Sequence, residues 1–216
     1  AYRGKQIYQW TYQHGLTDFA EMTNLSTALR DRLTAEFRIG RPAINTALVS
    51  TDGTRKWLLG FGDHNEAEMV SIPEKTRGTL CVSSQVGCTL TCAFCHTGTQ
   101  RLVRNLTAGE VVGQVMLARD EYGLWPASKG NIQLTNIVMM GMGEPLYNFD
   151  NVAKALHIVM DGDGLPACGA RRVARQAGAD QPEIPACGTA GSLPQLRGGL
   201  QCAADYVRIC DAQRRE

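Results

Sequence analysis

The sequence has no cysteine before Cys81, no lysine after Lys154, no long apolar run and no strong net charge. No stretch reaches the roughly 18 consecutive apolar residues of a membrane-spanning helix, so we expect no membrane segment. The N-terminus has neither an initiator methionine nor the charged-then-apolar layout of a secretion signal, which indicates a clipped chain or a fragment and a cytoplasmic protein. A formal net charge of +1 argues against a protein that only binds RNA, but it allows an RNA enzyme with a local basic patch.

The composition is that of a globular protein, since 44% of the 216 residues are apolar and 20% are charged. In the cytoplasm the eight cysteines are expected to be metal ligands or catalytic thiols rather than disulfides. Four of them lie between Cys81 and Cys95. The others show no metal-like spacing and are Cys168, Cys187, Cys202 and Cys210.

Residues 1–75 are expected to form an accessory region, in which helices precede a small antiparallel β unit. A four-residue spacing of apolar side chains predicts helix within residues 1–40, and Ser26 stands where a helix would need its N-cap. An Asp-Gly hairpin turn predicts the β unit over residues 43–72.

From residue 76 to about residue 165 strands, loops and helices alternate, which predicts an α/β fold with parallel strands. A strand over residues 79–85 and another over residues 136–140 each lead into a loop and then a helix. Thr107, with a glutamate three residues on, predicts a capping box on the first helix, and Asp150 is expected to cap the second. Ligands bind beyond the carboxyl ends of such strands, so both loops are candidate ligand sites.

The first of these loops contains Cys88, Cys92 and Cys95, spaced as CxxxCxxC. Three thiolates can hold three irons of a 4Fe-4S cluster and leave the fourth iron open, where a small molecule can chelate it. One alternative is a zinc site completed by Cys81 or His96, although structural zinc usually takes two pairs of ligands. The other alternative is ordinary buried cysteine.

The second loop contains Gly143 and Glu144 within GMGEP. Its glycines permit close backbone approach to a ligand, and the carboxylate can accept hydrogen bonds from an ammonium group. Beside an open iron, Glu144 would suit the amino group of S-adenosylmethionine. The alternative is a tight strand-to-helix turn with no ligand.

The segment LCVSSQVGCTLTCAFCHTGTQRLVRNLTAGEVVGQV resembles the RlmN/Cfr family of radical S-adenosylmethionine RNA methyltransferases, and its RlmN branch in particular. The resemblance extends over about residues 1–165, through YRGKQIYQWTYQHGLTDFAEMTNLSTALRDRL, TRKWLLGFGDHNEAEMVSIPE, NIVMMGMGEPLYNFDNVAKAL and DGDGL. It implies a partial (βα) barrel of the radical SAM type, incomplete here, behind the accessory region.

The resemblance implies methylation of C2 of an adenosine in 23S rRNA, with tRNA as a second candidate substrate. It implies a 4Fe-4S cluster held by Cys88, Cys92 and Cys95, and S-adenosylmethionine contacted by Gly143 and Glu144. It also implies an electron donor such as flavodoxin, and we expect a monomer. Methylation of C8, as in the Cfr branch, is the alternative reaction.

In this family a cysteine near the C-terminus carries a methyl group, from which a 5′-deoxyadenosyl radical removes hydrogen before the carbon adds to adenine. A second cysteine then helps to release the enzyme from the RNA, and that residue matches Cys81. Glu68 matches the family's proposed acid/base. Without the resemblance, Cys81 would be a small buried strand residue and Glu68 a solvated one.

Residues 166–216 depart from the family pattern. They have no sustained period and no lysine, and the serine that the family uses to contact S-adenosylmethionine is missing. This predicts either a disordered tail or a shifted reading frame, and the methyl-carrying cysteine cannot be assigned, Cys187 included. We therefore expect little or no turnover from this polypeptide, and a non-catalytic remnant that binds zinc or RNA is the alternative function.

Overall fold

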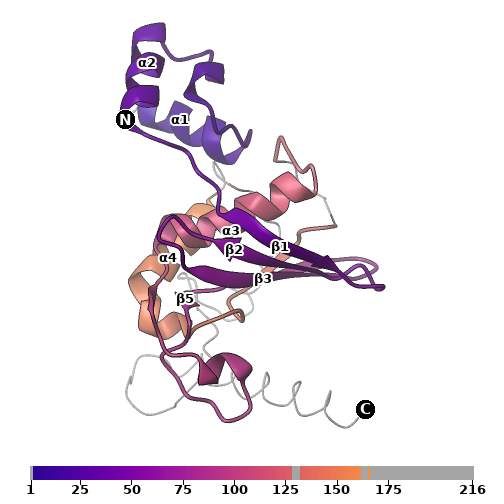
Figure 1. Cartoon of the computed structure of the whole chain (residues 1–216). Coiled ribbons are helices and arrows are strands. Elements are labelled where there is room, and N and C mark those ends of the chain that lie inside the picture. Colours follow the sequence, from indigo (N-terminus) through magenta and orange to yellow (C-terminus); the bar gives the residue numbers. More distant parts are fainter. Residues whose placement is uncertain (1, 128–131, 162–164, 166–216) are drawn as a thin grey trace, which may run out of the picture.

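The computed structural model describes residues 2–127, 132–161 and 165 (Figure 1). Its helices are α1 (Tyr2–Tyr12), α2 (Thr27–Glu36), α3 (Ala108–Glu121) and α4 (Phe149–Met160), with short 3₁₀ helices η1 (Phe19–Glu21), η2 (His96–Thr99) and η3 (Pro145–Asn148). Its strands are β1 (Ala43–Val49), β2 (Arg55–Gly60), β3 (Glu66–Pro73), β4 (Gly78–Cys81), β5 (Gln85–Val86), β6 (Arg104–Asn105) and β7 (Asn136–Val138). Within these ranges no helix is long and apolar enough to cross a membrane. The predicted atypical tail and its four cysteines lie outside the described residues.

The N-terminal helices pack around a small apolar cluster of Phe19, Met22 and Leu25. They lie at the opposite end of the molecule from the cysteine loop (Figure 1). The helical region consists of two helices, since α1 ends at Tyr12 and α2 begins at Thr27, within the stretch where the apolar spacing predicted a helix. Ser26 is the N-cap of α2 as expected, but its side chain makes no capping hydrogen bond.

Five strands form one sheet in the order β1-β2-β3-β4-β7. The first four strands pair antiparallel, and β4 pairs parallel with β7. The β unit predicted from the sequence therefore continues directly into the first core strand, through register pairs such as Val70 with Cys81. The sequence did not predict this continuity, because strand pairing across the chain leaves no local pattern.

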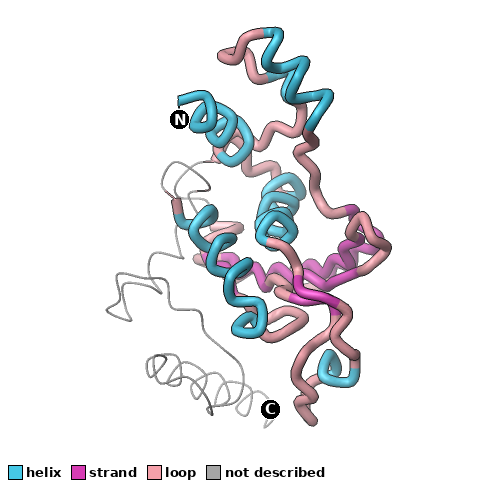
Figure 2. The backbone as a smooth tube through the Cα atoms, turned by 90° about the vertical axis from the view of Figure 1, so that its left-hand side faces the viewer, coloured by secondary structure: helices cyan, strands magenta, loops and turns pink. Residues whose placement is uncertain are grey.

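The two faces of the sheet differ in burial because successive side chains of a strand point to opposite sides. One face carries Trp57, Leu59, Met69 and Leu80, which share a core with residues of α3 and α4. Figure 2 shows these two helices on one side of the strands. The other side, which we call the open face, is only partly covered and carries Lys56, Leu58, Glu68, Val70 and Cys81.

The crossover between β4 and β7 contains the cysteine loop and α3. The predicted capping box is confirmed, since Thr107 Oγ1 accepts from the Glu110 N–H and the Glu110 carboxylate accepts from the Thr107 N–H. The predicted strands are shorter than expected: β4 ends at Cys81 and β7 at Val138. Beyond Cys81, Val82 still donates to the Val138 carbonyl at 3.0 Å, and Ser84 and Gln85 then donate to the Met142 carbonyl in the following loop.

The prediction that Asp150 caps the last helix is wrong, because Asn148 is the N-cap of α4 and Asp150 lies in its first turn. The Asn148 amide does not cap the helix either. It donates to the carbonyls of Ser84 at 2.8 Å and Leu106 at 2.7 Å, and so ties the start of α4 to the end of β4.

We expect Thr107→Ala to lower the free energy of unfolding by about 1 kcal/mol, because it removes the hydroxyl of an intact capping box. Ser26→Ala is the matched control, since Ser26 has the same position on α2 without a capping bond. Urea unfolding followed by circular dichroism measures both losses. Equal losses in the two variants would contradict the assignment of the cap.

Candidate active site

The cysteine loop begins after β5 and ends at β6, and these two short strands pair antiparallel in a small sheet of their own that closes the base of the loop. Cys88 lies at this base, where its backbone forms an isolated parallel β-bridge with that of Arg101. Farther out, the carbonyl of Cys92 accepts from the N–H of Cys95 at 3.1 Å, and that of Cys95 accepts from Gly98 at 2.9 Å. The loop therefore folds back on itself in tight turns that keep the last two cysteines close.

The three cysteines share one electrostatic neighbourhood with Glu144. The pKa of Cys92 is raised, first by burial and then by negative charge on Cys88, Cys95 and Glu144. The cysteine triplet and Glu144, which belong to two separate motifs of the sequence, are therefore close enough in the fold for their charges to interact. Positive charge among them would relieve the repulsion.

A single zinc ion and an iron–sulfur cluster require different arrangements of the same thiolates. Among the described residues, no three His, Cys, Asp or Glu side chains converge on a point that could hold one ion. Structural zinc requires such convergence by four ligands, whereas each thiolate of an iron–sulfur cluster binds a different iron. Both alternatives draw their thiolates from this loop, so the metal content of the purified chain separates them.

The GMGEP loop lies directly against the end of β4. The carbonyl of Met142 accepts from the N–H groups of Ser84 at 2.8 Å and Gln85 at 3.2 Å, and the Met142 N–H donates to Ser83 Oγ at 2.8 Å. Gly143 has a φ of +94°, and a Cβ there would lie 2.5 Å from the Cβ of Gln85. Glycine is required both by this backbone conformation and by the close packing.

Glu144 is buried, with 2% of its surface exposed. Its carboxylate accepts from the Leu146 N–H at 3.2 Å, and burial raises its pKa. No cation of the described chain pairs with it, and an unpaired buried carboxylate is costly. Glu144 is therefore suited to receive a positively charged group such as a ligand ammonium.

Glu68 and Cys81 lie on neighbouring strands of the open face. Because Val70 is opposite Cys81, Glu68 is diagonal to Cys81, an arrangement in which Cα atoms are about 7–8 Å apart and long side chains can meet. The Glu68 carboxylate pairs with Lys56 Nζ at 2.6 Å. Burial raises the pKa of Cys81 to about 11, partly offset by a hydrogen bond from the Met140 backbone. The structure thus places both residues on one surface without showing a contact between them.

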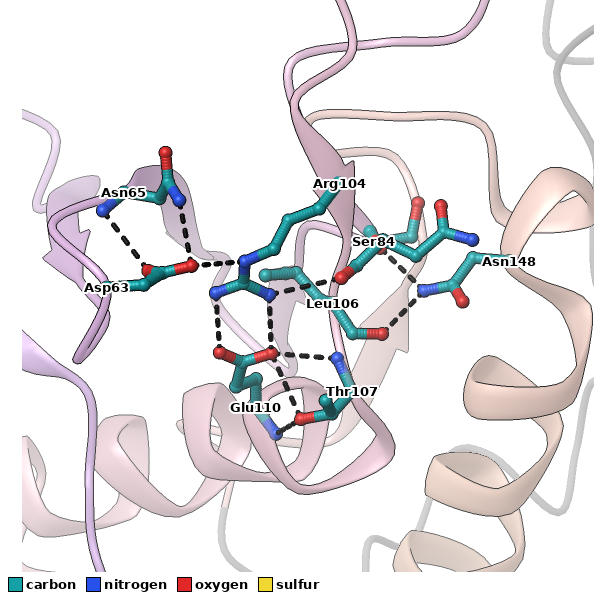
Figure 3. A network of polar contacts seen from close by, with 9 residues as sticks. Asp63, Asn65, Ser84, Arg104, Leu106, Thr107, Glu110 and Asn148 are labelled. Carbon is teal, nitrogen blue, oxygen red and sulfur yellow. Dashed lines mark hydrogen bonds and ion pairs between the residues drawn. The ribbon is translucent and has the colours of Figure 1, made fainter.

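The exit of the cysteine loop is held by Arg104 (Figure 3). Its guanidinium donates two parallel hydrogen bonds to Glu110, at 2.8 and 2.9 Å, and pairs with Asp63 in the turn before β3. Paired charges of this geometry are stronger and more specific than single hydrogen bonds. Arg104 therefore fixes the loop exit to both α3 and the β unit.

The sequence provided no reason to single out the polar residues that follow β4, namely Ser83, Ser84 and Gln85. All three are fully buried, and they bond to the GMGEP loop, to α3 or to the cysteine loop. The available signal was three adjacent polar residues directly after an apolar strand. That pattern equally fits an exposed turn, and only the parallel pairing of β4 with β7 explains their burial.

Comparisons with known proteins agree with this geometry. Residues 1–39 match the family model described as ribosomal RNA large subunit methyltransferase N-terminal domain. A dual-specificity RNA methyltransferase RlmN from Rhizorhabdus wittichii is 62% identical over 171 residues, which cover 79% of this chain and 42% of that protein. Its counterpart from Rhodospirillum rubrum is 54% identical over 208 residues, covering 96% of this chain and 48% of that protein.

Among solved structures, a radical SAM methyltransferase from Sphaerobacter thermophilus matches with a TM-score of 0.70 and 36% identity, covering 85% of this chain and 55% of the other. The fold is therefore that of the radical SAM methyltransferases, a class that uses S-adenosylmethionine and a 4Fe-4S cluster. Within this class, the chain belongs to the RlmN family. It spans about half the length of the curated relatives it matches.

We expect alkylation of Cys81 by iodoacetamide to accelerate about tenfold per pH unit from pH 7 to pH 10, because only the thiolate reacts and its pKa is raised to about 11. In the urea-unfolded chain the rate should level off near pH 9, the ordinary value for the thiol. Since the folded pKa is the higher one, this thiol contributes stability below pH 9 that is lost as the pH rises through 11. Peptide mass spectrometry measures the rates, and a plateau below pH 9 in the folded chain would contradict the assignment.

Gly143→Ala is expected to cost about 2 kcal/mol of stability, since the new Cβ meets Gln85 in a backbone conformation that disfavours side chains. Gly109→Ala is the control: no atom lies within 4 Å of its Cβ position in α3, so a gain of about 0.5 kcal/mol is expected. Thermal unfolding of the two variants tests the difference. Similar stability of both would show that the turn is less tightly packed than described.

Proposed function

We propose that this chain forms the cluster-binding half of an enzyme that methylates C2 of adenosine in RNA by radical S-adenosylmethionine chemistry. The observation that supports this most directly is the junction of the cysteine loop with the GMGEP loop at the carboxyl ends of β4 and β7. One loop supplies three thiolates and the other a buried carboxylate, so a ligand bound there could contact both.

In this proposal Cys88, Cys92 and Cys95 hold the 4Fe-4S cluster, which when bound supplies the single electron that cleaves S-adenosylmethionine. Glu144 accepts hydrogen bonds from the amino group of that molecule, and its burial strengthens the interaction by excluding water. The turn at Gly143 lets the backbone approach the ligand closely, because there is no side chain to intervene.

The open face receives the target base in this proposal. Cys81 is held as a neutral thiol there, so it must lose a proton before it can help to release the enzyme from the RNA. Glu68 lies diagonally across the strand pair and is the proposed acceptor of that proton. The Nζ of Lys56 lies 2.6 Å from the Glu68 carboxylate, and this ion pair helps to hold the Glu68 side chain over the open face.

The proposed substrates are 23S rRNA and tRNA, because the matching relatives are named dual-specificity RNA methyltransferases. An adenosine inside folded RNA must be turned out before C2 can be reached, which requires an accessible surface such as the open face. We further propose an electron donor of the flavodoxin type, a monomeric state and a cytoplasmic location. Methylation at C8 is the alternative reaction, and fragmentation mass spectrometry of the modified adenosine separates the two positions.

Anaerobic purification tests the cluster assignment. The wild-type chain should be brown and contain about four irons and four sulfides per chain, as one cubane requires. Cys92→Ala should lose most of this iron, whereas Cys81→Ala, which changes a cysteine outside the triplet, should keep it. A colourless wild-type chain that contains zinc would contradict the proposed function and favour the non-catalytic alternative.

A further inference from the structure

Gln85 lies between the two halves of the site. It is fully buried at the start of β5, four residues after Cys81 and three before Cys88. Its Oε1 accepts from the backbone N–H of Glu144 at 3.0 Å and from that of Thr89 at 3.2 Å. One side-chain oxygen therefore bonds both to the residue after the first cluster cysteine and to the proposed ligand of the amino group.

The other end of the same amide completes the arrangement. Gln85 Nε2 donates to Asn105 Oδ1 at 2.7 Å and to Thr89 Oγ1 at 2.9 Å. Asn105 belongs to β6, the short strand that follows the cysteine loop and pairs with β5. The amide thus contacts the start of the loop, its end and the GMGEP turn at once.

A buried amide is costly unless its donors and acceptor are satisfied, so this geometry is sharply defined. Packing restricts it further, because the absent side chain of Gly143 leaves the space that Gln85 Cβ occupies. If the Gln85 amide is removed, the N–H groups of Thr89 and Glu144 lose an acceptor, and the side-chain link between the two loops is broken.

We propose that Gln85 is a positioning residue that sets the distance and orientation of the Glu144 turn relative to the Cys88 end of the cysteine loop. This inference rests on the proposed function. In that function S-adenosylmethionine binds the open iron and Glu144 at the same time. Its affinity therefore depends on how closely the distance and orientation between these two groups are fixed. Gln85 is not one of the residues proposed to bind the cluster or S-adenosylmethionine, so in this inference it acts through Thr89, Asn105 and Glu144.

The test compares Gln85→Met with Gln114→Met in the full 216-residue chain. Methionine keeps the length of glutamine and removes its hydrogen bonds. Gln114 is the matched control, because it is an equally buried amide that bonds the backbone of Ser83 and touches neither the cysteine loop nor Glu144. After anaerobic reconstitution, iron content, the affinity for S-adenosylmethionine and the electron paramagnetic resonance spectrum of the reduced cluster are measured.

We expect Gln85→Met to retain iron but to bind S-adenosylmethionine about tenfold more weakly, as loss of a buried acceptor predicts. The change that S-adenosylmethionine causes in the resonance spectrum should shift to correspondingly higher ligand concentration. Gln114→Met should lose thermal stability without either change. Equal affinities in Gln85→Met and the wild type, or an equal loss of affinity in both variants, would overturn the inference while leaving the proposed function intact.

If Gln85→Met takes up no cluster, hydrogen–deuterium exchange of the cluster-free chain tests whether Gln85 holds the two loops. Faster exchange in residues 86–99 and 141–146 together, relative to wild type and Gln114→Met, supports the inference, and unchanged exchange in either segment overturns it. A wild-type chain that binds neither iron nor S-adenosylmethionine would contradict the proposed function and this inference with it.

Discussion

The parallel pairing of β4 with β7 is the constraint on which the rest of the site depends. It places the carboxyl ends of the two strands side by side, and the Met142 carbonyl then accepts from the backbone of Ser84 and Gln85. Two loops that are about fifty residues apart in the chain are joined there by main-chain hydrogen bonds. The junction also requires the absence of side chains at Gly141 and Gly143, where a Cβ would collide with the residues that follow β4.

Because side chains alternate along the strands, the residues that form the core and the candidate site residues lie on opposite faces of the sheet. Trp57, Met69 and Leu80 point toward α3 and α4 and form the core. Their strand neighbours point to the open face, which holds Glu68 and Cys81 without covering them fully. Residues of the open face can therefore be substituted without altering the residues that form the core on the other face.

Much of this arrangement was predictable from local pattern: the cysteine triplet, the α/β alternation and the capping box at Thr107. Glu68 and Cys81 are candidate site residues on the family resemblance alone, since local pattern does not single them out. Neither approach found Gln85, because its role arises from contacts with residues distant in the sequence. The position of the cap on α4 was missed for the same reason, since Asn148 is placed by its bonds to β4 and not by helix propensity.

The central claim is that the two loops form one cofactor site with a single open iron beside Glu144. Mössbauer spectroscopy of the chain reconstituted with ⁵⁷Fe tests this most directly, because it distinguishes the irons by their ligands. The account predicts that S-adenosylmethionine shifts the signal of one iron in four. In Glu144→Gln the iron content should be unchanged, but a higher concentration of S-adenosylmethionine should be needed to produce the same shift. Four irons that do not respond to S-adenosylmethionine would contradict it.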